Sequence, residues 1–378
     1  MYNLTSLDNI NIIEIEGSSF CNAGCPYCAR HLTGTSIRDT GFTQTHVPFK
    51  LIEKLKTDFG KQTENQELWF VGNLGDALMN PEIDKMWHFG LRHFDYIEIE
   101  TNGGLRTVDY WKHMGNICKR KGYGGAITFS IDGLEDTNEI YRKKVKWDKL
   151  MENVEAYLSA GGRANWKWLV FEHNEHQIDE ARTLAKKMGF RKFDVQYSTR
   201  YNETLYDPNE GKVEEVNLDK RGKEHKGETT ALSTNVDDKI DSILKDVDYF
   251  NPQKRISCKY IKQKRMYLNA KGRIWPCCWH SAKYDKYDDL REMEPALITH
   301  YKDGFNDYNT KSMQEIFDHK AWVQMTDSWK TVDPTNKTAP FNLCARKCVN
   351  DKWMATCNIS KHEEGYKNSS MIQKNGLL

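Results

Sequence analysis

The sequence lacks any long hydrophobic run. No stretch of eighteen apolar residues, roughly the length of a transmembrane helix, occurs among its 378 residues. The first residues, MYNLTSLDNINIIEIEG, also lack the basic region followed by an apolar segment that marks a secretory signal peptide. These two absences predict a soluble cytoplasmic protein with no membrane partner.

An excess of charge of one sign is lacking too. Lys and Arg number 55, Asp and Glu number 54, and the formal net charge is +1. A chain this close to neutral has no overall field that would attract nucleic acid, a membrane or another polyanion. We therefore expect its function to come from local sites, and nucleic acid is not an expected partner.

Cysteine, by contrast, is present and unevenly placed. Ten cysteines in a cytosolic chain favour metal binding or chemistry over disulfides. Three lie within residues 21–28, Cys118 stands alone, and six lie between residues 258 and 357. This distribution predicts two metal regions, and it predicts a core position for Cys118, because a lone cysteine on a helix behaves as a small apolar residue.

Between the two cysteine regions, β-branched or aromatic runs alternate with amphipathic patterns, which indicates repeated βα units. Apolar residues that recur every three or four positions mark helices. Strands are expected at residues 11–17, 67–73, 96–102, 126–132, 165–172 and 192–198, and helices at 48–59, 148–162 and 176–190. The units predict an α/β fold with a partial (β/α)6 TIM-like barrel, whose active site lies at the C-terminal ends of the strands.

Cys21, Cys25 and Cys28 follow the first expected strand. Three thiolates in one short loop can bind three irons of a cubane and leave the fourth iron open to another ligand. A structural zinc site would need four protein ligands, and His31 is the nearby candidate for the fourth. The spacing Cys-x3-Cys-x2-Cys, with Tyr27 before the last cysteine, resembles the radical S-adenosylmethionine (SAM) superfamily.

Together with later motifs, this resemblance covers about residues 10–200. It implies that the three cysteines bind a catalytic [4Fe-4S] cluster, that SAM binds at the open iron, and that its reductive cleavage gives a 5′-deoxyadenosyl radical. It also implies an external electron donor such as a flavodoxin or a ferredoxin.

The segment GNLGDALMNPEI (72–83) follows the second expected strand and resembles the Gly-Gly-Glu-Pro loop of that superfamily. In the family, backbone carbonyls and a carboxylate of this loop face the ammonium group of methionine. Gly75 and Asp76 match the second glycine and the acid, whereas Leu74 and Ala77 depart from the pattern. Without the cysteines, Gly-Asp after a strand would be interpreted as an ordinary turn.

The motifs ETNGG (100–104) and SIDG (130–133) end the next two expected strands. The resemblance implies further cofactor contacts in and after these motifs and on the fifth strand. For each residue the alternative is a strand-end turn, a solvated charge or a buried strand position. The expected contacts are Asn102, Ser130 and Asp132 at the ribose or methionine, Arg142 at the methionine carboxylate, and Val170 near the adenine.

The C-terminal region begins with CKYIKQKRMYLNAKGRIWPCCWH (258–280), in which two β-like runs flank a tight-turn sequence. Cys258, Gly272 and Cys277 match the Cys-x(9–15)-Gly-x4-Cys opening of the SPASM and twitch extensions, which carry auxiliary iron–sulfur clusters. The segment CARKCVNDKWMATC (344–357) supplies a later Cys-x3-Cys and a further cysteine. The Cys-x2-Cys-x5 of the full SPASM pattern is missing.

Two cubanes would need eight thiolates, and this region offers six, so the resemblance implies one auxiliary Fe-S cluster, most simply [4Fe-4S]. The expected ligands are Cys258, Cys277, Cys344, Cys348 and Cys357, with Cys278 as a spare. A zinc site built from the same residues is the alternative. The expected domains are the barrel (1–200), a polar connection (201–256) with a short helix at 237–250, and a cysteine-rich α+β SPASM/twitch-like domain (257–378).

Two features bear on the substrate. Residues 253–273 carry eight Lys or Arg and no acid, which indicates either a solvated face or attraction of an acidic substrate, peptide or RNA. The first expected strand begins near residue 11, which leaves no room for an N-terminal peptide-docking domain. We therefore expect a small molecule or a short peptide that is recognised without a separate module.

The sequence thus predicts a radical SAM oxidoreductase that abstracts a substrate hydrogen and uses the auxiliary cluster to support a net oxidation. One alternative is a ribosomal-peptide maturase that forms a cross-link. Another, of a different class, is an Fe-S electron-transfer or iron-sensing protein. Gly75, Asp76, Ser130 and Asp132 argue against that class, because an electron carrier needs no contacts to ribose or methionine.

Overall fold

The computed structural model describes residues 7–31, 36, 38–120, 124–197, 205–206, 213–214, 256, 258–287, 295–329, 343–344 and 348. Most of the expected polar connection, the expected helix at 237–250 and Cys357 lie outside the described residues. No helix in the described part of the chain has both the length and the apolar character needed to cross a membrane.

Strands in chain order form a parallel sheet, and each lies within one of the ranges expected from the sequence or begins one residue before it. Their bounds are β1 (Ile12–Ile15), β2 (Glu67–Phe70), β3 (Tyr96–Thr101), β4 (Gly125–Ser130), β5 (Ala164–Val170) and β6 (Lys192–Tyr197). The prediction of consecutive parallel βα units is therefore confirmed.

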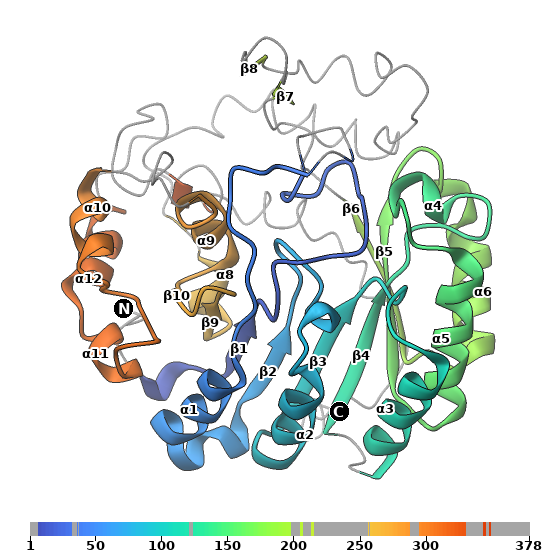
Figure 1. The fold of residues 1–378 in the computed structure, drawn as a ribbon, viewed down its shortest axis with the longest axis horizontal. Coiled ribbons are helices and arrows are strands. Elements are labelled where there is room, and N and C mark those ends of the chain that lie inside the picture. Colours follow the sequence, from blue (N-terminus) through green and yellow to red (C-terminus); the bar gives the residue numbers. More distant parts are fainter. Residues whose placement is uncertain are drawn as a thin grey trace.

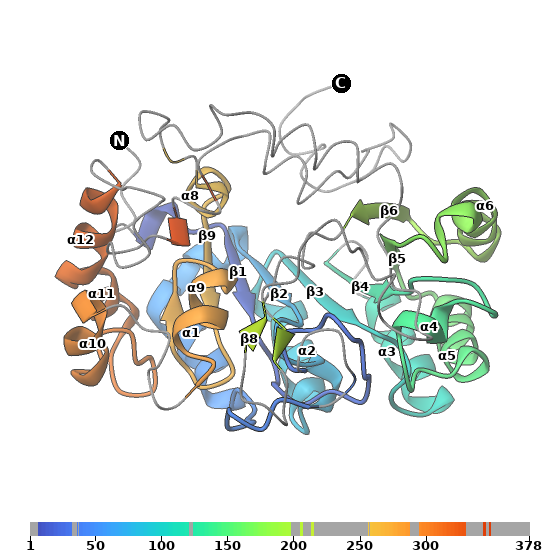
Figure 2. The same cartoon turned by 90° about the horizontal axis from the view of Figure 1, so that it is seen from above.

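Helices connect these strands and lie along the outer side of the curved sheet (Figures 1 and 2). In α1, for example, Leu51, Leu55 and Phe59 recur every four residues and are all buried, as the sequence pattern predicts. The helices are α1 (Phe49–Phe59), α2 (Ile83–His93), α3 (Val108–Arg120), α4 (Asn138–Tyr141), α5 (Trp147–Ser159) and α6 (Ile178–Met188).

The sheet continues beyond β1 into the C-terminal region. Strand β9 (Arg265–Leu268) pairs in parallel with β1, and β10 (Ile274–Trp275) pairs antiparallel with β9. The order is β10-β9-β1-β2-β3-β4-β5-β6, and Figure 2 shows the strands along an arc. Among the described strands, β6 and β10 end this order without pairing to each other, so the sheet is a partial barrel.

A second sheet pairs β7 (Leu205–Tyr206) with β8 (Val213–Glu214).

The inner face of the barrel is polar. Along β3, burial alternates, and Ile97 packs against Gly90 of α2, whereas Glu98 on the other face accepts a hydrogen bond from Thr128 Oγ1 at 2.5 Å. Asn165 Nδ2 donates to the same Thr128 hydroxyl at 3.0 Å, which continues the polar contacts onto β5. The outer face therefore forms the apolar core with the helices, and the inner face leaves polar groups for chemistry.

Helices of the C-terminal region pack beside β9 and β10 (Figure 1). They are α8 (Lys259–Lys262), α9 (Cys278–Tyr284), α10 (Pro295–Lys302), α11 (Met313–Phe317) and α12 (Lys320–Ser328). The expected hairpin turn lies between β9 and β10, where Gly272 has a φ of 79°, a left-handed conformation that glycine adopts without strain.

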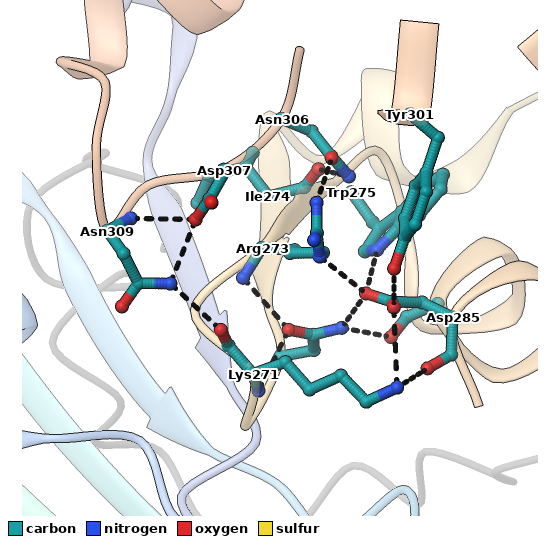
Figure 3. A network of polar contacts seen from close by, with 11 residues as sticks. Lys271, Arg273, Ile274, Trp275, Asp285, Tyr301, Asn306, Asp307 and Asn309 are labelled. Atoms are coloured by element: carbon teal, nitrogen blue, oxygen red, sulfur yellow. Dashed lines mark hydrogen bonds and ion pairs between the residues drawn. The ribbon is translucent and has the colours of Figure 1, made fainter. Parts of the chain in front are cut away.

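Asp285 holds this region together (Figure 3). Its buried carboxylate accepts hydrogen bonds from Asn269 Nδ2 at 2.6 Å and Trp275 Nε1 at 3.1 Å, and also from the Tyr301 hydroxyl. Lys271 Nζ lies 3.6 Å from the same carboxylate. One buried acid thus links the hairpin, the end of α9 and α10, and satisfying it with several donors offsets its desolvation.

Candidate active site

The loop after β1 carries Cys21, Cys25 and Cys28 over the C-terminal ends of the strands (Figure 1). Cys25 is buried, and the other two are half-buried. The Cys28 amide donates to the Cys25 carbonyl at 3.1 Å, and the Gly24 amide donates to the Lys143 carbonyl at 2.8 Å. The loop is therefore folded on itself and attached to the segment that follows α4.

Burial governs the protonation of Cys21 and Cys25. It raises the pKa of Cys25 to about 11, although the Arg142 charge opposes the shift. Burial, and then the Asp76 charge, raise the pKa of Cys21. Both groups hold their protons near neutral pH, and iron binding would displace those protons.

His31, the candidate fourth zinc ligand, contacts the backbone of the loop: its Nδ1 lies 2.8 Å from the Cys25 carbonyl oxygen. Within the described residues, no three His, Cys, Asp or Glu side chains converge as they would around a single metal ion. Zinc requires such convergence, whereas a cubane takes one thiolate per iron. The donor set of the loop therefore fits a cubane with one iron left open better than it fits zinc.

Gly75 brings the loop after β2 against the cysteine loop. A Cβ atom at this position would lie 2.0 Å from the Ser18 carbonyl oxygen and 2.6 Å from that of Phe20, so no other residue fits without a backbone shift. The next amide, of Asp76, donates to the Phe20 carbonyl at 2.8 Å. The Gly-Asp sequence thus has a packing role that a simple turn would not need.

The Asp76 carboxylate is buried and engaged. It accepts hydrogen bonds from the Leu78 amide at 3.0 Å and the Thr101 hydroxyl at 2.9 Å, and from both the amide and Nδ2 of Asn102 at 2.9 and 2.8 Å. Burial raises its pKa, and these donors oppose the shift. In this arrangement Asp76 orients Asn102, and its expected contact to the methionine ammonium stays a prediction.

Asn102 joins the end of β3 to the cysteine loop. Its Nδ2 donates to Asn22 Oδ1 at 2.8 Å and lies 3.7 Å from Cys21 Sγ. The sequence prediction placed Asn102 at the cofactor, and the structure places it beside the first cysteine. Asn22, which the sequence analysis did not single out, is its partner.

Asp132 and Arg142, two expected cofactor contacts, pair with each other. Arg142 Nε donates to Asp132 Oδ2 at 2.5 Å, and the Leu169 amide donates to Asp132 Oδ1 at 2.7 Å. Arg142 Nη1 also lies 3.9 Å from Cys25 Sγ. Burial lowers the pKa of Arg142, but the negative charges of Asp132 and then Cys25 outweigh burial and raise the pKa above its usual value. A permanent positive charge therefore stands beside the cysteine loop.

The remaining expected cofactor residues lie in the cysteine loop or at the ends of strands. Tyr27 is buried in the cysteine loop, Ser130 ends β4 and is half-buried, and Val170 ends β5 and is fully buried. Sequence analysis missed Lys167, which lies opposite Ser130 and whose Nζ is 3.1 Å from the Glu100 carboxylate. The signal for it was a lysine inside the otherwise apolar run NWKWLVFE.

Residues 15–185 match the sequence model of the Radical SAM superfamily. This segment is a radical SAM domain. Such a domain implies a [4Fe-4S] cluster and SAM as cofactors, in agreement with the cysteine loop. For this segment the prediction of a radical SAM domain is confirmed, as is that of the partial-barrel fold; a SPASM or twitch extension is not confirmed.

Solved structures share the fold at low sequence identity. A structure of anSMEcpe with bound AdoMet superposes with a TM-score of 0.52 at 14% identity, over 90% of this chain and 88% of that one. Streptococcus suis SuiB with S-adenosylmethionine gives a TM-score of 0.50 at 14% identity, over 84% and 68%. The complex of SuiB with its precursor peptide SuiA gives 0.51 at 12% identity, over 84% and 66%. No curated protein matches the sequence.

Three described cysteines of the C-terminal region lie near a fourth, Cys277. Cys258 and Cys277 directly precede α8 and α9. Burial raises the pKa of Cys277 well above its usual value, and the next causes are the nearby Cys278, Cys258 and Cys344. Cys278, Cys258 and Cys344 thus all lie close enough to Cys277 to affect its protonation. Cys348 is half-buried.

A histidine missed by the sequence analysis lies among these sulfurs. His280 Nδ1 is 3.1 Å from Cys277 Sγ, and His280 Nε2 is 3.6 Å from Cys344 Sγ. Burial lowers the pKa of His280 to about 3, so the ring is neutral. The signal for it was the spacing of CCWH, which puts the histidine three residues after Cys277.

This group of cysteines contacts the loop that carries Gly75. Asn73 Nδ2 donates to the Cys278 carbonyl at 3.1 Å, and the Cys278 amide donates to the Tyr260 hydroxyl at 3.5 Å. The Tyr260 hydroxyl in turn donates to the Glu14 carboxylate on β1. The two cysteine regions are therefore joined through the inner face and the upper loops of the barrel.

The basic segment 253–273 is not a solvated face throughout. Arg265 pairs with Glu14 at 2.5 Å, and its side chain is only 13% exposed. Lys271 and Arg273 lie 3.6 and 3.9 Å from the buried Asp285 carboxylate. For these three residues the interpretation as solvated charges is wrong, because each compensates a buried acid.

Proposed function

We propose that this protein is a radical SAM enzyme that abstracts a hydrogen atom from its substrate. The observation that carries the proposal is the position of Cys21, Cys25 and Cys28 at the C-terminal ends of the strands, joined to the end of β3 through Asn102 and to Arg142. When bound, the cluster and SAM supply the reductive cleavage that yields the 5′-deoxyadenosyl radical.

The residues of this chain orient and shield that chemistry. The Arg142 charge partly compensates the negative charge that three thiolates bring into a buried loop. Asp76 fixes the Asn102 side chain, whose Nδ2 is directed at Cys21. We propose that the Gly75 backbone and Ser130 contact SAM, because Gly75 packs against the segment that leads into the cysteine loop and Ser130 lies at the C-terminal end of β4.

A second part of the proposal is an auxiliary iron–sulfur cluster in the C-terminal region, with Cys258 and Cys277 among its ligands. The gathering of four cysteines next to the loop of Gly75 supports it. The cluster would accept an electron from the substrate radical, so that the reaction is a net oxidation. An external donor such as a flavodoxin or a ferredoxin would supply the first electron, which agrees with a cytoplasmic location.

For the substrate we propose a small molecule or a short peptide, and we favour the peptide. SuiB has been solved with a precursor peptide, and anSMEcpe with a Cp18Cys peptide, and both share this fold. Cross-link formation in such a peptide is the more specific alternative. Incubation with candidate peptides, followed by tandem mass spectrometry, tests this: both products lose two hydrogens, but only a cross-link suppresses fragmentation between the two linked residues.

The first test is anaerobic reconstitution of the full chain, followed by iron and sulfide analysis and an assay of 5′-deoxyadenosine with SAM and a strong reductant. We expect more than four irons per chain, because one cubane accounts for about four. We also expect 5′-deoxyadenosine, and none from the C21A/C25A/C28A variant. Bound iron without any 5′-deoxyadenosine would favour an electron-transfer protein instead.

A further inference from the structure

The segment that carries the cysteine loop is attached to the C-terminal region as well as to the barrel. Lys286 Nζ donates to Asp39 Oδ2 at 2.7 Å, and the Tyr287 hydroxyl donates to the same oxygen at 2.9 Å. Asp39 lies between β1 and α1, whereas Lys286 lies 247 residues further along the chain. The contact therefore reaches the cysteine loop from outside residues 15–185, the part of the chain that matches the radical SAM family.

The ion pair of Lys286 and Asp39 is enclosed rather than exposed. Only 12% of the Lys286 side chain and 13% of the Asp39 side chain are accessible to solvent. The Lys286 ammonium lies 5.4 Å from the centre of the buried Phe42 ring and 4.8 Å from that of the Tyr287 ring, and aromatic faces attract a cation. Removing one partner would leave a largely buried charge uncompensated, which costs more than an exposed ion pair contributes.

Lys286 is itself held in place. It directly follows Asp285, the residue at the end of α9. The Asp285 carboxylate accepts hydrogen bonds from Asn269 Nδ2 at 2.6 Å and Trp275 Nε1 at 3.1 Å, which attach the end of α9 to the hairpin of β9 and β10 (Figure 3). Because β9 pairs with β1, Lys286 is attached through this hairpin to the strand that leads into the cysteine loop.

Hydrogen bonds carry the attachment from Asp39 to the cysteines. The Asp39 amide donates to the Arg30 carbonyl at 2.8 Å, and Nη1 of the buried Arg30 side chain donates to the Cys21 carbonyl at 3.2 Å. The His31 amide donates to the Cys28 carbonyl at 2.9 Å. Within the described residues between β1 and α1, the backbone forms isolated bridges but no helix or strand. The shape of the cysteine loop therefore depends on contacts such as these.

We propose that Lys286 is a positioning residue for the catalytic site, and that its pair with Asp39 holds the loop of Cys21, Cys25 and Cys28 in the shape that binds the cluster. The inference rests on the proposed function. It adds a requirement for the C-terminal region that does not involve the cysteines of that region. Loss of the pair should loosen the cysteine loop even before any metal is bound.

Amide hydrogen exchange of the full chain, measured without metal, tests the attachment directly. In Lys286→Met, which removes the charge, the amides of Asp39 and His31 should exchange at least about tenfold faster than in the wild type. Asp39→Asn should have the same effect, and the double variant should show no larger one, because the two side chains act as a unit. Lys286→Arg keeps the charge and should restore slow exchange.

Lys54→Met is the matched control. Lys54 Nζ, on α1, donates to the Tyr308 carbonyl at 2.7 Å and lies 4.2 Å from the centre of the Tyr308 ring. It too joins the barrel to the C-terminal region through a lysine beside an aromatic ring, and its loss should leave exchange in the cysteine loop unchanged. Tyr287→Phe removes only the hydroxyl that bonds to Asp39, so it should give a smaller increase and replaces Lys286→Met if that variant does not fold.

Formation of 5′-deoxyadenosine by the reconstituted proteins separates this inference from the proposed function. We expect a loss of about tenfold or more in Lys286→Met, and none in Lys286→Arg or Lys54→Met. Unchanged exchange in Lys286→Met, an equal increase in Lys54→Met, or no rescue by Lys286→Arg would each overturn the positioning role. Absence of 5′-deoxyadenosine from the wild type would overturn the proposed function, and the exchange rates would still decide whether Lys286 holds the loop.

Discussion

The two cysteine regions are built in different ways. Cys21, Cys25 and Cys28 lie within one loop, and polar side chains from β3 and the segment after β4 attach that loop to the barrel. The C-terminal group draws Cys258, Cys277 and Cys344 from three distant segments, and a histidine joins two of them. A site local in sequence is visible as a motif, whereas a site assembled by folding is visible only as a gathering of side chains.

The largest expected effects come from removing each group of cysteines in turn. C21A/C25A/C28A should abolish 5′-deoxyadenosine formation completely. C258A/C277A should still cleave SAM but should lose the second set of irons and the oxidised product. The measurements are iron content and 5′-deoxyadenosine, and equal loss of cleavage in both variants would show that the two regions do not act separately.

The sequence could predict features that are local in the chain, and it could not predict those that folding assembles from distant segments. Strand positions and the outer helices follow from apolar periodicity, and their bounds agree within a few residues. The pairing of β9 with β1 could not be predicted, because it joins residues about 250 positions apart through backbone hydrogen bonds that any sequence could make.

The contacts of the site residues show more closely what the sequence could not predict. Asp132 and Arg142 are ten residues apart, and the motif could not predict that the fold pairs them with each other. Their expected contacts with the cofactor stay predictions. The sequence did not point to His280, because a histidine that follows two cysteines belongs to none of the motifs that mark the barrel. One of its two sulfur contacts is with Cys344, which is 64 residues away in the sequence.

A second prediction concerns the buried ion pair of the catalytic region. The Asp132 side chain is fully buried and that of Arg142 is 16% exposed, so Asp132→Asn leaves a guanidinium without its partner. We expect the free energy of unfolding to fall by about 3–5 kcal/mol. Chemical denaturation measures it, and Asp179→Asn, which breaks an exposed pair on α6, serves as the control with a change below about 1 kcal/mol.

A third prediction concerns Glu16, which joins the two regions, since its carboxylate accepts the Leu74 amide at 2.5 Å and lies near Asp285. Burial raises its pKa from 4.5 to about 7. The folded state therefore binds this proton more tightly than the unfolded state does. The stabilisation is full below pH 4.5 and is lost as the pH rises to about 7, and it amounts to about 3 kcal/mol.

Glu16→Gln tests this linkage. The free energy of unfolding of the variant should depend less on pH between about 4.5 and 7 than that of the wild type. Urea titrations at several pH values, at constant ionic strength, measure the difference. Parallel curves for the two proteins would mean that Glu16 ionises normally and that the contact with Leu74 compensates its burial.

The smallest effect should come from the cysteine that belongs to neither region. Cys118 on α3 is fully buried, and its thiol lies 3.3 Å from the Gly125 carbonyl oxygen on β4. Cys118→Ala removes one packed sulfur, so we expect a loss of about 1–2 kcal/mol in the free energy of unfolding. Iron content and 5′-deoxyadenosine formation should be unchanged, and a loss of iron would place Cys118 with the metal-binding cysteines rather than in the core.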